Sequence, residues 1–339
     1  FPTRRSSDLV LNTSMYQLFS SFIQDKKSLS IIQAENPDGD SVGAAIALDY
    51  LLSQKNIDLY CPVDIPKYLH YFQDWSRISS DFNFQADGYI IVDTTAEILL
   101  SKLLNNPTIK NRLFTAPVLA LDHHETPDSL TFPHQSIIEP RPACCDLIYH
   151  IAIAENIPIN QFAAKALFQG ILSDTLGLSS TSVTAETFRT AAALTELGAN
   201  IAELEANRHE FMKKSPRILA YKADLIKRIE YYLDGTLATV HIPWDDIREY
   251  SNEYNPNALI LEEMRFVENI KVAVAIKTYP DGKITGKLRT NPDTPIAEKI
   301  ANFFGGGGHA FAAGFRIYNT TYEAVIRDLI KIIPEFLND

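Results

Sequence analysis

Two apolar runs that each end in an aspartate limit most strongly how this chain can fold. Tyr89–Asp93 (YIIVD) and Pro117–Asp122 (PVLALD) are almost continuously apolar, as expected of strands covered on both faces. Further strands are expected at Ser28–Ala34, Asp58–Val63 and Ser136–Glu139, and helices at Asp40–Gln54, Cys144–Asn156 and Thr184–Ala199. This alternation predicts an α/β fold with a doubly wound, mostly parallel sheet.

The length of 339 residues is enough for two domains. We expect the sheet domain at residues 10–199, a helical connector at 200–231 and a smaller α/β domain at 232–339, with a cleft between the two domains. The smaller domain should contain a hairpin within Ile270–Thr290 and a final helix at Thr321–Leu337. Phe1–Leu9 (FPTRRSSDL) fit none of these patterns and read like a translated sequencing adapter. We expect them to be an artefactual tail, with Met15 as one natural start.

The overall charge excludes one class of protein. A net charge of −11 argues against a protein that coats long nucleic acid, because such proteins carry basic tracks that replace counterions.

No apolar run reaches the roughly 20 residues that span a bilayer, and the start lacks a signal-peptide pattern. Three cysteines, two of them adjacent, suit a reducing cytoplasm better than a disulfide scaffold.

Acidic residues and histidines gather where such a sheet binds ligands, beyond the carboxyl ends of its strands. Each alone is ordinary, since an aspartate after a strand often caps a helix. Together the carboxylates would repel one another and resist ionisation unless a multivalent cation, such as Mn²⁺ or Mg²⁺, lay among them. The residues concerned are Asp38, Asp40, Asp93, Asp122, His123, His124 and Asp174.

These residues stand in segments that resemble a known family. In order, NPDGDSVGAA, IIVDTT, LDHHETP and GILSDTLGLSS resemble the four motifs of the DHH phosphoesterases. Phe304–Phe315 (FGGGGHAFAAGF) is similar to the Gly-Gly-Gly-His motif of the C-terminal domain found in the nuclease branch. Within the family, the chain is most similar to the NrnA-type oligoribonucleases and adenosine 3',5'-bisphosphate phosphatases.

The resemblance implies a centre of two Mn²⁺ or Mg²⁺ ions. Asp38 and Asp93 would hold the first ion, with Asp93 bridging to the second. The second would also be held by Asp40, His123 and Asp174.

The resemblance also implies a catalytic set and a substrate site. Asp122 would orient a histidine and His124 would face the phosphate, so that these two residues and Asp93 form the catalytic set. The substrate would be bound in the second domain by Arg289, His309, Gly306, Gly307 and Gly308.

One position departs from the family pattern. Relatives commonly carry a histidine two residues before the Asn-Pro-Asp, as a ligand of the first metal, and here that residue is Ala34. Gln33 and Glu35 flank it, but strand alternation turns them to the opposite face. We therefore expect a weak first metal site.

These features imply a metal-dependent phosphoesterase. By resemblance it would hydrolyse short oligoribonucleotides to mononucleotides, and also adenosine 3',5'-bisphosphate to AMP, with a metal-activated water. Two alternatives remain open: a hydrolase of pyrophosphate or polyphosphate, and a catalytically weakened nucleotide-binding module. The expected partner is short RNA or a nucleotide, rather than long DNA or a membrane, and a homodimer is one expected state.

Overall fold

The computed structural model describes the backbone of residues 6–338 and the side chains of residues 15–308 and 310–337. Within this part the chain divides into two compact units, with the division between Lys213 and Lys214. Part of the tail expected at Phe1–Leu9, residues 1–5, lies outside the described residues, and helix α1 begins at Ser6.

The first unit is built on a parallel sheet, as the apolar runs predict. Its six strands lie in the order β3-β2-β1-β4-β5-β6, and every neighbouring pair is parallel. The strands are β1 (Ser28–Ile32), β2 (Asn56–Tyr60), β3 (Ile78–Ser79), β4 (Gly88–Val92), β5 (Val118–Asp122) and β6 (Gln135–Ile138).

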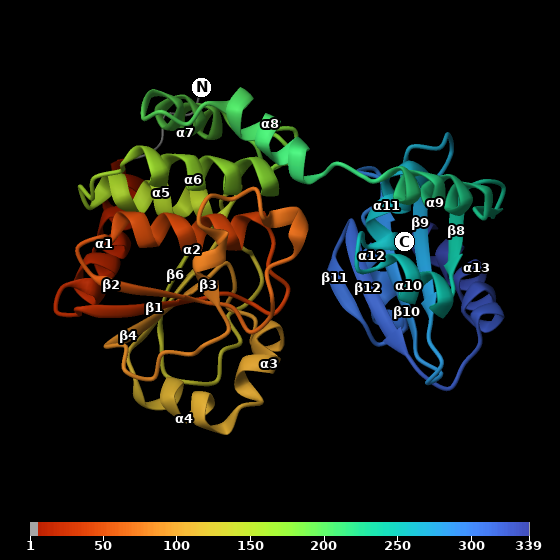
Figure 1. The fold of residues 1–339 in the computed structure, drawn as a ribbon, viewed down its shortest axis with the longest axis horizontal. Coiled ribbons are helices and arrows are strands. Elements are labelled where there is room, and N and C mark those ends of the chain that lie inside the picture. The colour runs from red at the N-terminus through yellow and green to blue at the C-terminus, as the bar shows by residue number, and fades with distance from the viewer. Residues whose placement is uncertain (1–5, 339) are drawn as a thin grey trace. The chain divides into compact units, whose positions relative to one another are not determined.

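Helices cover both faces of this sheet, so its strands contribute to two cores. Ile31 of β1 belongs to the core under α1, α2, α5 and α6, whereas its neighbour Ile32 faces the core under α3 and α4 (Figure 1). This arrangement explains why β4 and β5 are apolar at nearly every position rather than at alternate ones. The helices are α1 (Ser6–Ile23), α2 (Gly39–Leu51), α3 (Ser101–Leu104), α4 (Pro107–Thr115), α5 (Cys144–Ala154), α6 (Gln161–Asp174), α7 (Ala185–Glu196) and α8 (Ile201–Phe211), with single 3₁₀ turns at Lys67–Leu69, Trp75–Arg77 and Glu97–Leu100.

The strand order reverses between β1 and β4. The chain leaves β1 for β2 on one side and later returns to place β4 on the other side. At such a switch point the loops after the two strands diverge and leave a crevice at the carboxyl edge of the sheet. The loops after β1 and β4 and the end of β5 therefore meet at the edge where a ligand can bind.

The second unit holds a mixed sheet of order β11-β12-β10-β9-β8-β7, in which only the β8–β9 pair is parallel. Its expected hairpin is confirmed as β9 and β10, which turn through Gly282 at a positive φ of 76°. The strands are β7 (Glu230–Tyr232), β8 (Leu237–Ile242), β9 (Val272–Thr278), β10 (Ile284–Thr290), β11 (Gly307–His309) and β12 (Ala312–Ile317).

Two layers of helices pack on this second sheet and form separate cores. Helices α9 (Pro216–Lys227), α10 (Trp244–Tyr250) and α11 (Pro256–Arg265) cover one face, and α12 (Ala297–Phe303) and α13 (Tyr322–Asn338) cover the other. The helical stretch expected at 200–231 consists of α8 in the first unit and α9 in the second. None of the helices in residues 6–338 combines the length and apolar character needed to cross a bilayer.

Candidate metal centre

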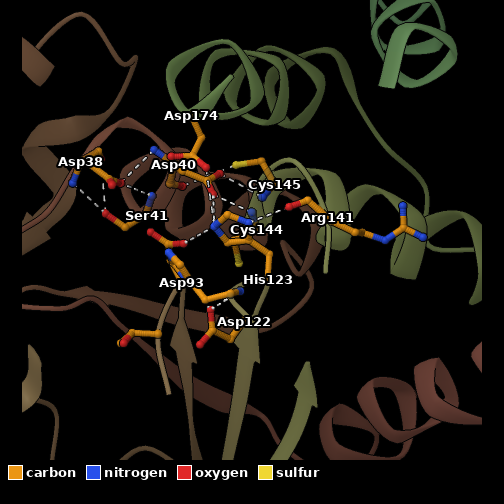
Figure 2. Close-up of polar contacts among 12 residues, drawn as sticks. Asp38, Asp40, Ser41, Asp93, Asp122, His123, Arg141, Cys144, Cys145 and Asp174 are labelled. Atoms are coloured by element: carbon orange, nitrogen blue, oxygen red, sulfur yellow. Dashed lines mark hydrogen bonds and ion pairs between the residues drawn. The ribbon is translucent and has the colours of Figure 1, made fainter. Parts of the chain in front are cut away.

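Carboxylates from three parts of the first unit converge on one histidine at the carboxyl edge of the sheet. Asp40 lies in the first turn of α2, Asp93 directly follows β4, His123 directly follows β5, and Asp174 is the last residue of α6. Figure 2 shows the three carboxylates pointing toward the ring of His123. The structure therefore brings together four of the five predicted metal ligands.

The imidazole of His123 is oriented with one nitrogen toward these acids. Its Nδ1 lies 2.8 Å from the carbonyl oxygen of Arg141, to which it donates. Its Nε2 then lies 3.3 Å from Asp93, 3.6 Å from Asp174 and 3.8 Å from Asp40. A hydrogen bond that commits one ring nitrogen leaves the other as the ligand atom, which is the usual arrangement of a metal-binding histidine.

The carbonyl group that orients His123 belongs to a fixed residue. The guanidinium of Arg141 is nearly buried and ion-paired with Glu139 at 2.8 Å and Asp146 at 3.0 Å. Since these contacts restrain the side chain of Arg141, they also restrain the carbonyl group that receives the imidazole proton.

The charges of the cluster are poorly balanced in the protein alone. Burial and the charges of nearby acids raise the pKa of Asp93 well above its ordinary value and that of Asp174 to about 7, and burial also raises the pKa of Asp40. Burial alone would lower the pKa of His123, but the three carboxylates raise it to about 10. Each group shifts toward its protonated form, as expected where negative charge is concentrated out of water.

The donor set fits a divalent cation. Oδ1 of Asp93 is buried, and within the described residues it faces Nε2 of His123 at 3.3 Å. Ligand atoms of Asp40, His123 and Asp174 lie within 4.8 Å of one another, as do those of Asp93, His123 and His124. A buried carboxylate oxygen beside imidazole and further carboxylates suits Mn²⁺, or Mg²⁺ with water ligands.

The backbone at Asp93 is strained where it meets the cluster. Asp93 has a φ of 65°, in the left-handed region that non-glycine residues seldom adopt. Such strain is concentrated at ligand sites, where the surrounding structure holds it. Here the flanking β4 strand and the hydrogen bond from the Asp93 N–H to the Leu121 carbonyl hold this conformation.

A contact that sequence reasoning missed fixes Asp40. The backbone N–H groups of Cys144 and Cys145, at the start of α5, donate to the two oxygens of its carboxylate at 2.5 and 3.0 Å. The positive end of the helix dipole adds to these bonds and favours the ionised carboxylate. Burial, reinforced by the nearby carboxylates, raises the pKa of both thiols, which argues against a thiolate at the helix start.

Asp122 orients the second histidine of the pair rather than the first. One of its oxygens accepts from the backbone N–H of His124 at 3.1 Å and lies 2.7 Å from Nδ1 of the same residue. Its other oxygen accepts from the Thr95 hydroxyl at 2.8 Å. The hydrogen bonds to His124, the largest of several favourable contacts, outweigh burial and lower the pKa of Asp122, so this acid stays ionised behind His124.

The residues predicted for the first metal ion are less closely gathered. Asp38 is the N-cap of α2, and one of its oxygens accepts from the backbone N–H groups of Asp40 and Ser41. Ala34 is buried two residues after the end of β1. The carboxylate of Glu35 accepts from the hydroxyl of Ser101 and so turns toward α3.

Comparison with known proteins identifies both units. Residues 28–171 match the family described as "DHH family, N-terminal domain", and residues 250–339 match the family described as "DHHA1 domain". The chain is a DHH-family protein. Its centre lies on the four segments that resemble the DHH motifs, and its glycine run lies in the DHHA1 domain.

Curated relatives match most of the chain. A protein named bifunctional oligoribonuclease and PAP phosphatase NrnA from Thermus thermophilus is 24% identical over 306 residues, which covers 89% of this chain and 88% of the relative. The Mycoplasma genitalium protein of the same name is 26% identical over 322 residues, covering 92% and 95%. The structure of an exopolyphosphatase-related protein from Bacteroides fragilis has a TM-score of 0.84 at 18% identity, covers 96% and 98% of the two chains, and so shares the fold.

The DHHA1 domain carries a group of cations on one face of its sheet. Lys287 and Arg289 are two residues apart on β10, so they lie on the same face of the sheet. Lys277 of β9 and Arg316 of β12 both pair with Thr285 and therefore lie on that face as well. Burial and the neighbouring positive charges of Arg289 and Arg316 lower the pKa of Lys287, as expected where cations are gathered out of water. The side chain of His309, a predicted substrate-binding group, lies outside the described residues.

The glycine run permits a close approach of two backbone segments. A Cβ on Gly306 would lie 2.2 Å from the carbonyl oxygen of Gly314, and one on Gly308 would lie 2.6 Å from that of Ala312. Gly305 and Gly308 also adopt positive φ angles of 72° and 145°. Glycine is required here by packing and conformation, so the run is a built element rather than a flexible linker.

Proposed function

We propose that this protein is a metal-dependent phosphoesterase that hydrolyses short oligoribonucleotides to mononucleotides, and also removes the 3' phosphate of adenosine 3',5'-bisphosphate. The proposal extends the family membership to a substrate class. It is supported by the names of the curated relatives and, above all, by the convergence of three carboxylates on Nε2 of His123.

The residues of the centre have separate tasks in this proposal. Asp40, Asp93, His123 and Asp174 would hold the divalent cations, and Asp38 would contribute from the N-cap of α2. Bound Mn²⁺ or Mg²⁺ would lower the pKa of a water molecule and neutralise charge that develops on the phosphate. The left-handed backbone at Asp93 and the α5 hydrogen bonds to Asp40 hold two ligands in place before the ion arrives.

His124 is assigned to the substrate. Its Nδ1 is committed to the ionised Asp122, so its Nε2 can donate to a phosphate oxygen or pass a proton to the departing ribose oxygen. The pairing resembles other catalytic histidines, in which a buried acid fixes the tautomer and stabilises the imidazolium.

We assign the binding of the substrate phosphate to the DHHA1 domain. Lys287 and Arg289 offer charge-assisted hydrogen bonds, and Gly306, Gly307 and Gly308 are included on their motif, since the Gly306 N–H itself donates to the Ala301 carbonyl at 2.8 Å. His309 is included on its motif alone. A local basic face on a chain of net charge −11 favours a small anionic substrate over a long polyanion.

The test offers the protein a panel of substrates with Mn²⁺ or Mg²⁺. The panel contains RNA of two to five nucleotides, a 24-mer, adenosine 3',5'-bisphosphate and pyrophosphate. We expect the short RNAs to be hydrolysed faster than the 24-mer. Faster hydrolysis of pyrophosphate would favour a phosphoanhydride hydrolase, and the absence of any metal-dependent turnover would favour a nucleotide-binding module.

A further inference from the structure

A cavity in the DHH domain borders the metal centre and extends from two of the motif segments to residues outside every motif. Its volume is about 410 Å³, within the roughly 300–1,000 Å³ typical of small-molecule sites. Asp38 at the start of α2 and Ser173, the neighbour of Asp174, both line it. Any group bound in the cavity therefore lies beside the phosphate that the metal centre would hold.

One wall of the cavity carries an amide without a partner. Gln169 of α6 is 6% exposed and lines the cavity, and its side-chain amide makes no hydrogen bond within the described part of the chain. A buried polar group costs stability unless it is satisfied, so an amide left open toward a cavity indicates a ligand or ordered water. Because a glutamine amide offers a donor beside an acceptor, it matches the edge of a nucleobase.

The other walls supply apolar surface and an aromatic ring. Tyr68 is 48% exposed and lines the cavity together with Leu172, Leu176 and Met212. Leu176 is held at a φ of 52° with 69% of its surface exposed, so strained backbone presents an apolar side chain at this site. Aromatic and aliphatic side chains of this kind accept the flat face of a base.

The charges of the cavity argue against phosphate as its occupant. Arg208 is the cation of the lining, and its Nε lies 3.0 Å from both carboxylate oxygens of Glu205, which neutralises it. Asp38 adds a further negative charge. A neutral, flat group with a hydrogen-bonding edge fits these surroundings better than an anion does.

We propose that this cavity is a subsite for the nucleobase next to the scissile phosphate, with Gln169 binding the edge of the base and Tyr68 packing on its face. The inference rests on the proposed function, because it names the part of a nucleotide substrate that the DHH domain binds. It also explains how an acidic unit can favour nucleotides over inorganic phosphoanhydrides.

The test compares substrates that differ in the presence of a base. The full-length protein with Mn²⁺ is assayed on the dinucleotide pApA and on bis-p-nitrophenyl phosphate, which has no base. In Gln169→Met, which keeps the length of the side chain, we expect the ratio of the two kcat/KM values to fall about tenfold, as the loss of one or two hydrogen bonds predicts. Gln161→Met, on the exposed start of the same helix, should leave the ratio unchanged.

Tyr68→Ala should lower the same ratio and Tyr68→Phe should retain it, because only the ring is required for stacking. An unchanged ratio in Gln169→Met, or an equal loss on both substrates, overturns the subsite. If the wild-type protein turns over neither pApA nor the other RNAs, the proposed function fails instead. Adenosine binding to the chelated protein, followed by saturation-transfer NMR, then decides the subsite: a signal that Gln169→Met abolishes supports it, and no signal overturns it.

Discussion

Metal binding to the centre should release protons. A metal ion can bind Nε2 of His123 only after that nitrogen loses its proton, since Nδ1 keeps its own for the carbonyl of Arg141. With a pKa of about 10, His123 is protonated at pH 7, and Asp174, with a pKa of about 7, is half protonated. We therefore expect at least one proton to leave per centre filled at pH 7, because the raised pKa values of Asp40 and Asp93 can only add to the count, and the Mn²⁺ affinity to rise at least about tenfold per pH unit.

Calorimetric titration with Mn²⁺ in two buffers of different ionisation enthalpy, such as PIPES and HEPES, counts these protons. Asp174→Asn should lower the count by about half a proton. His134→Gln is the matched control, because His134 also has a raised pKa but pairs with Asp128 outside the centre. A count of zero at pH 7 would refute the reasoning, since His123 would then be neutral among its acids.

The same shifts fix the sign of the pH dependence of stability. The raised pKa of His123 contributes stability to the chelated protein that is complete below about 6.5 and lost as the pH rises toward 10. The raised pKa of Asp174 makes its burial increasingly unfavourable from about pH 4 to pH 7. Both groups therefore destabilise the chelated protein as pH rises, whereas the gain in melting temperature on adding Mn²⁺ should grow.

Three substitutions test the remaining assignments. Asp93→Asn, in which asparagine tolerates the left-handed backbone, should abolish hydrolysis and remove most of the stabilisation by Mn²⁺. For one site at 100 times its Kd, that stabilisation is about 2.7 kcal/mol. An unchanged rise in melting temperature on adding Mn²⁺ would contradict the role of Asp93. Arg289→Ala should raise KM about tenfold or more and leave the rise in melting temperature on adding Mn²⁺ unchanged, with Arg248→Ala as the control. Loss of that rise in melting temperature would contradict the assignment of Arg289 to the substrate. Ala34→His should tighten Mn²⁺ binding measured by titration, whereas Ala34→Leu, equally bulky but without a ligand atom, should not; tight binding of two ions by the wild type would contradict a weak first site.

The chemistry of the centre was predictable from the sequence because it follows the carboxyl ends of strands. Apolar runs identified β4 and β5, and the residues after them, Asp93 and His123, meet at the switch point as expected. A parallel sheet brings such positions together whatever the detail of its loops.

The contacts that orient the ligands could not be predicted in the same way. Asp40 is held by N–H groups of Cys144 and Cys145, and His123 by the carbonyl of Arg141. These are backbone atoms, which every residue type carries, so no side-chain pattern announces them. Gln169 did leave a signal, as a polar residue inside the apolar run of α6, but a helix pattern does not show which face borders a cavity.

The separation of the hydrophobic cores determines what the protein loses when divalent cations are withdrawn. Within the described residues, no core cluster includes side chains from both sides of the division between Lys213 and Lys214. All the candidate metal ligands lie in the first unit, so metal binding stabilises the cores of that unit, while the cationic face built around Arg289 rests on the cores of the second unit. Under the proposed function, depletion of divalent cations would stop hydrolysis without unfolding this face, so the protein would bind nucleotide without hydrolysing it.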